Sequence, residues 1–189
     1  MRTLLVLTGL LLLAWAIYAF NRLVRLRNQV RAGWADIDVQ LTRRHDLVPQ
    51  LVAAVKAYAG HERATFETVT ELRARAASLQ SPLTLDSAAT LGAVETELER
   101  ALGRLLALKE AYPELKSNET FGRLQQNLVE IEDALQYARR FYNGAVRDYR
   151  TALQRFPDML VGRTAGFTPA EFFQASDEER RASRVELSP

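Results

Sequence analysis

The sequence contains no cysteine, and this absence excludes several classes of site. Structural disulfides, thiolate zinc sites, iron–sulfur clusters and cysteine nucleophiles all need a thiol that the chain does not have. The absence leaves the compartment open, because a cysteine-free chain suits the cytosol and the periplasm equally. Lysine is scarce as well, so arginine supplies almost all of the positive charge.

An excess of charge of one sign is also missing. The 189 residues include 25 basic and 23 acidic side chains, which give a net charge of +2. An imbalance this small is not the electrostatic footprint of a nucleic-acid-binding protein, and we expect no nucleic-acid partner. With 48% apolar residues, the chain can bury the core of one domain with a small appendage.

Motifs for catalysis and cofactor binding are incomplete. His61-Glu62 begins like a zinc-protease motif, but the second histidine of that motif is missing. The segment 162–167 lacks the Gly-Lys-Ser/Thr ending of a phosphate-binding loop, and no Glu-x-x-His pair suits a di-metal bundle. We therefore predict a non-enzymatic chain without metal or cofactor. The acidic residues of the later helices are expected on solvated faces: Glu95, Glu97, Glu99, Glu130, Glu132 and Asp133.

One long apolar run stands at the N-terminus. Thr3–Phe20 holds 18 residues without a charge, close to the roughly 20 that a helix needs to cross a bilayer. A cleaved signal peptide is the alternative, because Ala14-Trp15-Ala16 resembles a cleavage site. The apolar run continues past that site, and the helical pattern enters the following residues without a break. We therefore favour an uncleaved transmembrane anchor over residues 1–21, which contacts the bilayer through residues 3–20.

Arginines flank this run unequally. Arg22, Arg25, Arg27 and Arg31 follow it, whereas only Arg2 and the α-amine precede it. The positive-inside rule then places the body in the cytoplasm and the N-terminus outside, with a periplasmic body as the alternative.

The rest of the chain has helical periodicity. Between residues 21 and 80, apolar residues recur at alternating steps of three and four, which is the spacing of one helix face. A kink is expected near His45–Pro49, because proline removes a backbone hydrogen bond. The seam consists of Leu23, Leu26, Val30, Trp34, Ile37, Leu41, Arg44, Val48, Leu51, Val55 and Tyr58.

Two further helices are predicted, at about 85–111 and 119–156. Ser81–Thr84 and Tyr112–Asn118 separate them, with Ser117 or Asn118 as the cap of the last helix. Eleven seam positions of that helix are all apolar or aromatic: Phe121, Leu124, Leu128, Ile131, Leu135, Ala138, Tyr142, Ala145, Tyr149, Ala152 and Phe156. The pattern predicts an all-α fold, an elongated antiparallel bundle of three long helices behind the anchor. A split of the first helix at Pro49 or at Tyr58–His61 would make four.

The bundle is expected to span residues 22–175 and to end in a short aromatic tail. Thr168, Pro169 and Glu171 have the pattern of a helix start, with Thr168 as the cap. Phe167, Phe172 and Phe173 are expected to dock on the bundle. Residues 176–189 are polar, and we expect them to be frayed.

Arg44 departs from the apolar pattern of its own seam. A buried guanidinium is costly unless it is paired. One interpretation is structural: Arg44 reaches the bundle surface or pairs with an acid of a neighbouring helix. The other is a functional polar cluster, Arg43 to Asp46, exposed where the helix bends. We favour the structural interpretation.

Several segments, taken together, resemble the LemA family of bacterial membrane proteins. They are 37–52 (IDVQLTRRHDLVPQLV), 55–62 (VKAYAGHE), 110–116 (EAYPELK), 138–143 (ARRFYN), Phe156-Pro157, Gly166-Phe167 and Phe172-Phe173. The resemblance implies an antiparallel four-helix type of bundle behind one transmembrane helix, in the bacterial cell membrane. It implies no enzymatic activity and no cofactor.

The motif positions supply a candidate interaction or structural polar cluster, with no catalytic role to inherit. Its members are Asp38, Arg43, Arg44, Asp46, Tyr112, Lys116, Arg139, Tyr142 and Asn143. The leading hypothesis is a membrane-anchored scaffold that binds other membrane or membrane-associated proteins. The alternative is a membrane-remodelling or lipid-associated structural protein. Neither the partner nor the oligomeric state follows from the sequence.

Overall fold

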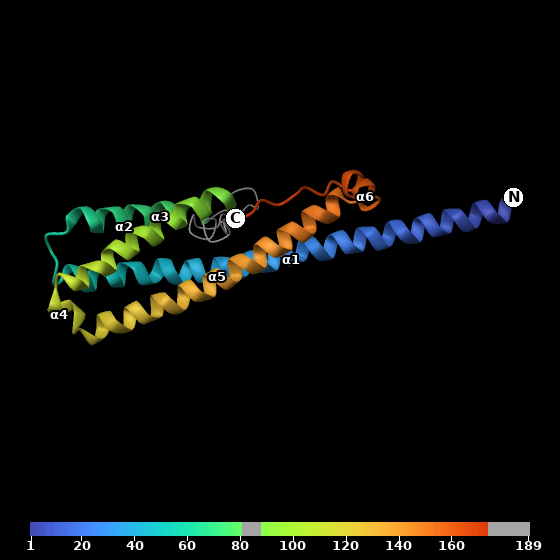
Figure 1. Ribbon diagram of the computed structural model, residues 1–189. Helices are drawn as coiled ribbons and strands as arrows, with labels where there is room; N and C mark the ends of the chain where they lie inside the picture. The colour runs from blue at the N-terminus through green and yellow to red at the C-terminus, as the bar shows by residue number, and fades with distance from the viewer. Residues whose placement is uncertain (81–87, 174–189) are drawn as a thin grey trace, which may run out of the picture.

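The computed structural model describes residues 1–80 and 88–173, and in these ranges the fold is all-α (Figure 1). The four long helices are α1 (Arg2–Lys56), α2 (Arg63–Gln80), α3 (Ala88–Ala107) and α5 (Glu119–Gln154). Shorter elements are a 3₁₀ turn (Leu108–Glu110), α4 (Pro113–Lys116) and α6 (Asp158–Thr164). The body is elongated, and the N-terminal part of α1 projects beyond it as a rod (Figure 1).

The four long helices alternate in direction. From the N-terminus, α1 runs to the far end of the body, α2 returns, α3 runs out again, and α5 returns to the level at which the rod leaves the body (Figure 1). Short connections produce this order, because a chain that turns within a few residues places consecutive helices antiparallel and side by side. The predicted antiparallel bundle is confirmed, with four helices.

The first helix ends after Lys56 and not at Pro49. It continues through Pro49, and the separation from α2 lies at Ala57–Glu62, so the second of the two predicted split points is the right one. Pro49 has no N–H with which to bond the carbonyl of His45, one turn earlier. Nε of Arg73, on α2, donates to that carbonyl at 3.2 Å. A neighbouring helix thus satisfies the carbonyl that the proline leaves without its usual partner.

The predicted seams form the core. In α5, ten of the eleven seam residues are buried, and the exception is Phe156, which lies beyond the end of the helix and is 73% exposed. Asn118 caps α5: its Oδ1 accepts a hydrogen bond from the backbone N–H of Phe121 at 2.8 Å. The bounds 85–111 predicted for the second of the three bundle helices, which corresponds to α3, were too wide at the C-terminal end. There α3 gives way to the 3₁₀ turn after Ala107. The predicted connection at Ser81–Thr84 and the start of that helix at residue 85 lie outside the described residues.

The C-terminal segment differs from the prediction. The helix predicted to start at Thr168 is absent, since residues 167–173 are non-helical, whereas α6, which the sequence analysis missed, occupies Asp158–Thr164. Of the three aromatic residues predicted to dock, two do so, whereas Phe172 is 40% exposed. Phe173 is 1% exposed, and Phe167 is half-buried against the core. The predicted frayed end at 176–189 lies outside the described residues.

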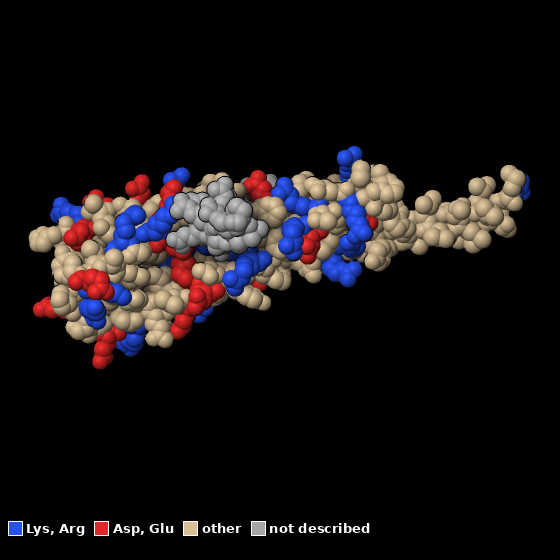
Figure 2. Space-filling model, viewed as in Figure 1, with Lys and Arg blue, Asp and Glu red and all other residues tan. Residues whose placement is uncertain are grey.

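The rod is the first third of α1. Its side chains up to Ala14 are all exposed, and in the space-filling view it is a bare apolar extension of a charged body (Figure 2). Among the described residues, α1 is the one helix whose length and composition would allow it to cross a membrane. Residues 2–14 of the predicted anchor are helical and exposed, whereas Ala19 near its end is fully buried.

Candidate functional site

A polar layer divides the core of the body into two apolar halves. One half includes Leu41, Val94 and Leu135, and the other includes Leu47, Leu98 and Ile131. Each half thus receives one of these residues from α1, one from α3 and one from α5. In each of the three helices, charged or ionisable residues lie between its two apolar positions. They are Arg44 and His45 of α1, Glu95 of α3 and Glu132 of α5.

Arg44 joins the three helices of this layer. Its side chain is fully buried, and its Nη1 donates to Oε1 of Glu132 at 2.6 Å. Its Nη2 donates to Oε2 of Glu95, which is fully buried as well. His45 Nε2 lies 2.7 Å from the other carboxylate oxygen of Glu95. A planar guanidinium suits this task, because its donors are fixed in a fork that can reach two carboxylates at once.

The charges of the layer stabilise one another against desolvation. Burial acts to lower the pKa of Arg44, but attraction to Glu95 and Glu132 outweighs burial and raises that pKa above its usual value. Burial acts to raise the pKa of Glu95, but Arg44 and the hydrogen bond with His45 outweigh it and hold the pKa below its usual range. Both groups therefore stay ionised in the folded state at neutral pH.

A second pair extends the layer toward the C-terminal tail. Arg139 of α5 is 7% exposed, and its Nη1 lies 3.7 Å from Oε2 of Glu99 on α3. Burial and then repulsion from Arg44 lower the pKa of Arg139. Burial and then the charge of Glu132 raise the pKa of Glu99. At 3.7 Å this pair is looser than the contacts of Arg44 and lies beyond ordinary hydrogen-bond distance.

The layer has the chemistry of a structural element. Each short contact joins a side-chain nitrogen of α1 to a carboxylate of another helix, so the layer connects α1 to α3 and α5 in the interior of the bundle. Among the residues described, no group of three or more histidine or acidic side chains is arranged to hold a metal ion. The exposed cluster that the second interpretation of Arg44 envisaged does not form at this residue, because Arg44 points into the core and pairs with acids of neighbouring helices.

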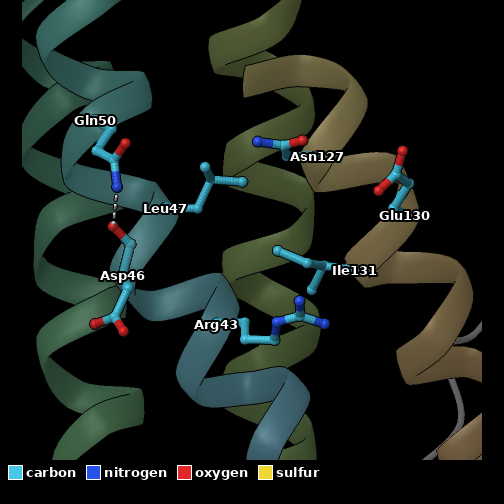
Figure 3. Close-up of a pocket in the computed structure, with 7 residues that line it drawn as sticks. All are labelled: Arg43, Asp46, Leu47, Gln50, Asn127, Glu130 and Ile131. Atoms are coloured by element: carbon cyan, nitrogen blue, oxygen red, sulfur yellow. Dashed lines mark hydrogen bonds between the residues drawn. The ribbon is translucent and has the colours of Figure 1, made fainter. Parts of the chain in front are cut away.

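Arg43 and Asp46, the neighbours of Arg44, face the surface. They line a groove of about 350 Å³ between α1 and α5, and Figure 3 shows them on one side of it with Leu47 and Gln50. Asn127, Glu130 and Ile131 of α5 form the other side. The groove therefore offers charges of both signs and amides around two apolar side chains.

Two other predicted residues hold the tail. Tyr142 is fully buried, its ring centroid lies 5.2 Å from that of Trp34, and its hydroxyl donates to the carbonyl of Glu171 at 2.7 Å. Asn143 makes a two-way contact with Phe173: Nδ2 donates to the carbonyl and Oδ1 accepts from the N–H, each at 3.0 Å. These contacts explain why the tail is not helical. Tyr142 and Asn143 of α5 bond to backbone N–H and carbonyl groups of the tail, which are the groups that a helix would bond to one another.

The remaining members of the predicted cluster lie elsewhere. Asp38 Oδ1 accepts from Nε2 of Gln80 at 2.6 Å, which ties α1 to the end of α2. Tyr112 is half-buried against the second apolar half, next to α4. Lys116 is exposed and pairs with Glu110 at 3.0 Å. The predicted set is thus distributed among a buried layer, a surface groove, a tail clamp and three separate positions elsewhere on the bundle.

The acidic half of the layer was not predicted from the sequence. Glu95 was expected on a solvated face, and that expectation is wrong, because its side chain is fully buried. Glu99 and Glu132 are partly covered as well. A signal was present in the sequence. Glu95 directly follows Val94 and lies between Leu91 and Leu98, so it is next to the apolar side of α3, and an arginine in the α1 seam requires an acid at its own level.

Comparisons with known proteins agree with the fold and the motifs. The sequence profile of the LemA family matches residues 33–187. Magnetosome proteins MamQ 1 and MamQ 2 of Paramagnetospirillum magneticum are each 26% identical over 190 residues, covering 89% of this chain and 70% of theirs. Magnetosome protein MamQ of Magnetospirillum gryphiswaldense is 25% identical over 175 residues, with 82% and 64% covered. The profile spans the polar layer, the groove and the tail clamp, and the chain belongs to the LemA family.

Proposed function

We propose that this chain is a membrane-tethered scaffold of non-catalytic type, whose body binds other membrane or membrane-associated proteins through one side of the bundle. The tether is the apolar rod of α1, which is long enough to span and stands free of the body. Because rod and body share one uninterrupted helix, the body would be held at a fixed angle to the membrane. The names of the family and of its relatives are not those of enzymes.

The binding side is the α1–α5 face, which we define as Val39, Arg43, Asp46 and Gln50 of α1 with Asn127, Glu130, Tyr137 and Phe141 of α5. Successive members on α1 are separated by three or four residues. The same holds on α5, except that Glu130 and Tyr137 are separated by seven residues, which is two turns. Side chains at these intervals lie on the same side of a helix. The two helices approach closely at one end of this face, where a Cβ added to Gly33 would lie 3.0 Å from the ring of Phe141.

Exposed apolar side chains on this face carry the proposal. Val39 is 55% exposed, Tyr137 is 68% exposed and Phe141 is 46% exposed. Next to them, the groove adds Arg43, Asp46 and Glu130. Aromatic side chains beside mixed charges have the composition of a protein interface, in which aromatic anchors are surrounded by a polar rim.

Site-specific photocrosslinking in native membranes tests the proposal. A photoreactive amino acid replaces Tyr137, and the control carries it at Val129, which is 53% exposed. Val129 points roughly 100° away from Glu130 around α5. We expect a defined crosslinked protein from position 137 and from Val39, and none from 129. Phe141→Arg should abolish the product at 137. Equal products from 129 and 137, or none from 137, would contradict the proposed face.

We further propose that the body lies on the cytoplasmic side. The arginines after the rod support this orientation through the positive-inside rule. Reporters fused after residue 189, one active only in the cytoplasm and one only in the periplasm, test it. Activity of the periplasmic reporter would reverse the orientation and leave the binding face unaffected.

A further inference from the structure

Helix α6 lies at the level where the apolar rod ends. Asp158, the first residue of α6, is 5% exposed and forms an ion pair with Arg22 of α1. A Cβ added to Gly162 would lie 3.7 Å from Leu23 of α1 and 3.0 Å from Leu153 of α5, so α6 packs closely in the angle between these helices. Arg22 and Leu23 follow the last residue of the uncharged run, Phe20, by two and three positions.

The residues after α6 contact the same level. The ring of Phe167 lies 5.6 Å from that of Phe20, in an edge-to-face arrangement. The guanidinium of Arg27 lies 5.0 Å from the centre of the Phe167 ring. Segment 156–167 thus forms a collar beside the base of the rod, and Figure 1 shows α6 next to α1 at this point. We call residues 156–167 the collar.

The outer surface of the collar is apolar and basic at once. Phe156 is 73% exposed and Leu160, four residues later, is 49% exposed. Arg155 and Arg163 are exposed on either side of them. Figure 2 shows blue basic side chains gathered at the end of the body from which the rod projects.

We propose that the collar is a lipid-binding element, which inserts Phe156 and Leu160 between the headgroups of the bilayer and pairs Arg163 and the adjoining Arg155 with anionic phospholipid. The uncharged 18-residue run is about 27 Å long as a helix, close to the ~30 Å hydrocarbon thickness. A run that spans the bilayer therefore leaves the collar at headgroup depth. This inference rests on the membrane anchoring of the proposed function, but not on the α1–α5 face.

The chemistry favours a lipid surface over a protein at this place. At headgroup depth, the acyl chains of the lipid can bury apolar side chains without any partner protein. Basic residues within a few ångströms of an anionic leaflet are attracted to its negative charge. The ion pair of Arg22 with Asp158 and the packing of Gly162 hold the collar in place, so the surface is formed before it meets lipid.

The absence of cysteine allows a direct test in the full chain. Single cysteines replace Leu160 in the collar, Leu10 in the middle of the rod, or Val129 on the body, and each carries a nitroxide label. The labelled proteins are placed in nanodiscs of phosphatidylglycerol or of phosphatidylcholine. Accessibility to oxygen and to a water-soluble nickel chelate then reports the depth of each label. Circular dichroism checks that the helix content of every variant is unchanged.

We expect the label at 160 to lie at headgroup depth in phosphatidylglycerol, between the deep label at 10 and the aqueous label at 129. Replacing Arg155 and Arg163 by glutamate should lower the ratio of inserted to free collar on the order of tenfold in these discs. In phosphatidylcholine the same change should have little effect. The neutral pair Arg155→Gln and Arg163→Gln should show an intermediate loss.

Each contrary result has a separate meaning. An aqueous label at 160 with a deep label at 10 would overturn the collar inference and leave the anchor intact. An aqueous label at 10 would overturn both. Insertion at 160 that is equal in the two lipids and insensitive to the arginine replacements would overturn the assignment of an anionic surface.

Discussion

Replacing Arg44 by methionine removes the guanidinium that joins α1 to α3 and α5. Methionine keeps much of the volume and the helix propensity, so the main change is electrostatic. Glu95 then stays in a fully buried position without its strongest partner. Glu132 is less affected, because its side chain is 20% exposed and can be solvated again.

The expected loss follows from these environments. Breaking a buried ion pair by removing one partner costs about 3–5 kcal/mol. His45 remains 2.7 Å from Glu95 and offsets part of this, so we place Arg44→Met at the lower end, about 3 kcal/mol. In a domain of this size such a loss lowers the melting temperature by roughly 6–12 °C.

The loss should depend on pH. In the wild type the pKa of Glu95 is lowered in the folded state, so its contribution is complete above the unfolded value, near about 4.3, and is lost as the pH falls through the folded value. Without Arg44, burial raises the pKa of Glu95. The free-energy cost of burying the unpaired carboxylate then disappears in acid, because Glu95 binds a proton and becomes neutral. The difference in stability between the two proteins should therefore be largest near neutral pH. It should begin to shrink above the ordinary glutamate pKa of about 4.3, as Glu95 of the variant binds a proton, and shrink further below about pH 4, as the wild type loses its own contribution.

Urea unfolding of the full chain in detergent micelles, followed by circular dichroism at 222 nm, measures these differences. Adding Glu95→Gln to Arg44→Met should restore part of the loss, because the unpaired buried charge is gone. The control is Lys116→Met, which breaks the exposed pair with Glu110 and should leave the midpoint unchanged. If Arg44→Met and Lys116→Met unfold at the same urea concentration, the polar layer does not stabilise the bundle.

Four other substitutions test the packing of the helices and the hydrogen bonds of the tail and of the α5 cap. Gly33→Ala should destabilise the chain by about 1–3 kcal/mol, because the added Cβ would lie 3.0 Å from a ring of α5. Gly103→Ala should stabilise the chain by about 0.5–1 kcal/mol, because nothing lies within 4 Å of the added Cβ. The midpoints of urea unfolding compare the two variants. Asn143→Ala removes both hydrogen bonds to Phe173, and hydrogen exchange should show faster exchange confined to residues 167–173. Asn118→Ala removes the cap of α5 and should cost about 1 kcal/mol in the same urea assay; an unchanged midpoint would show that the cap is dispensable.

Much of the fold is predictable from spacing. The alternating steps of three and four residues identified which face of each long helix is buried, and ten of the eleven α5 seam positions are buried. The split of the first helix was harder to place. Pro49 is the stronger local signal for a break, but the carbonyl that it leaves unbonded receives Arg73 from α2, a contact that exists only after α2 has folded back.

The polar layer and the tail were less predictable for the same reason. A buried Arg44 predicts an acid on some neighbouring helix, but which acid depends on the relative register of α1, α3 and α5. At Thr168 the local sequence has a helix-start pattern, and Tyr142 and Asn143 bind the backbone of the tail in a different conformation. In both cases, contacts between segments far apart in the sequence determine the structure, and the local sequence pattern does not.

The proposed tether requires that the rod is a retained anchor and the first part of a continuous helix. The most direct measurement is the intact mass of the chain recovered from membranes washed with alkaline carbonate. We expect a membrane-bound protein of 21.3 kDa that retains residues 3–20. A shorter chain that begins near residue 17 and appears in the soluble fraction would contradict the account, because neither the tether nor the collar would then have a membrane to meet.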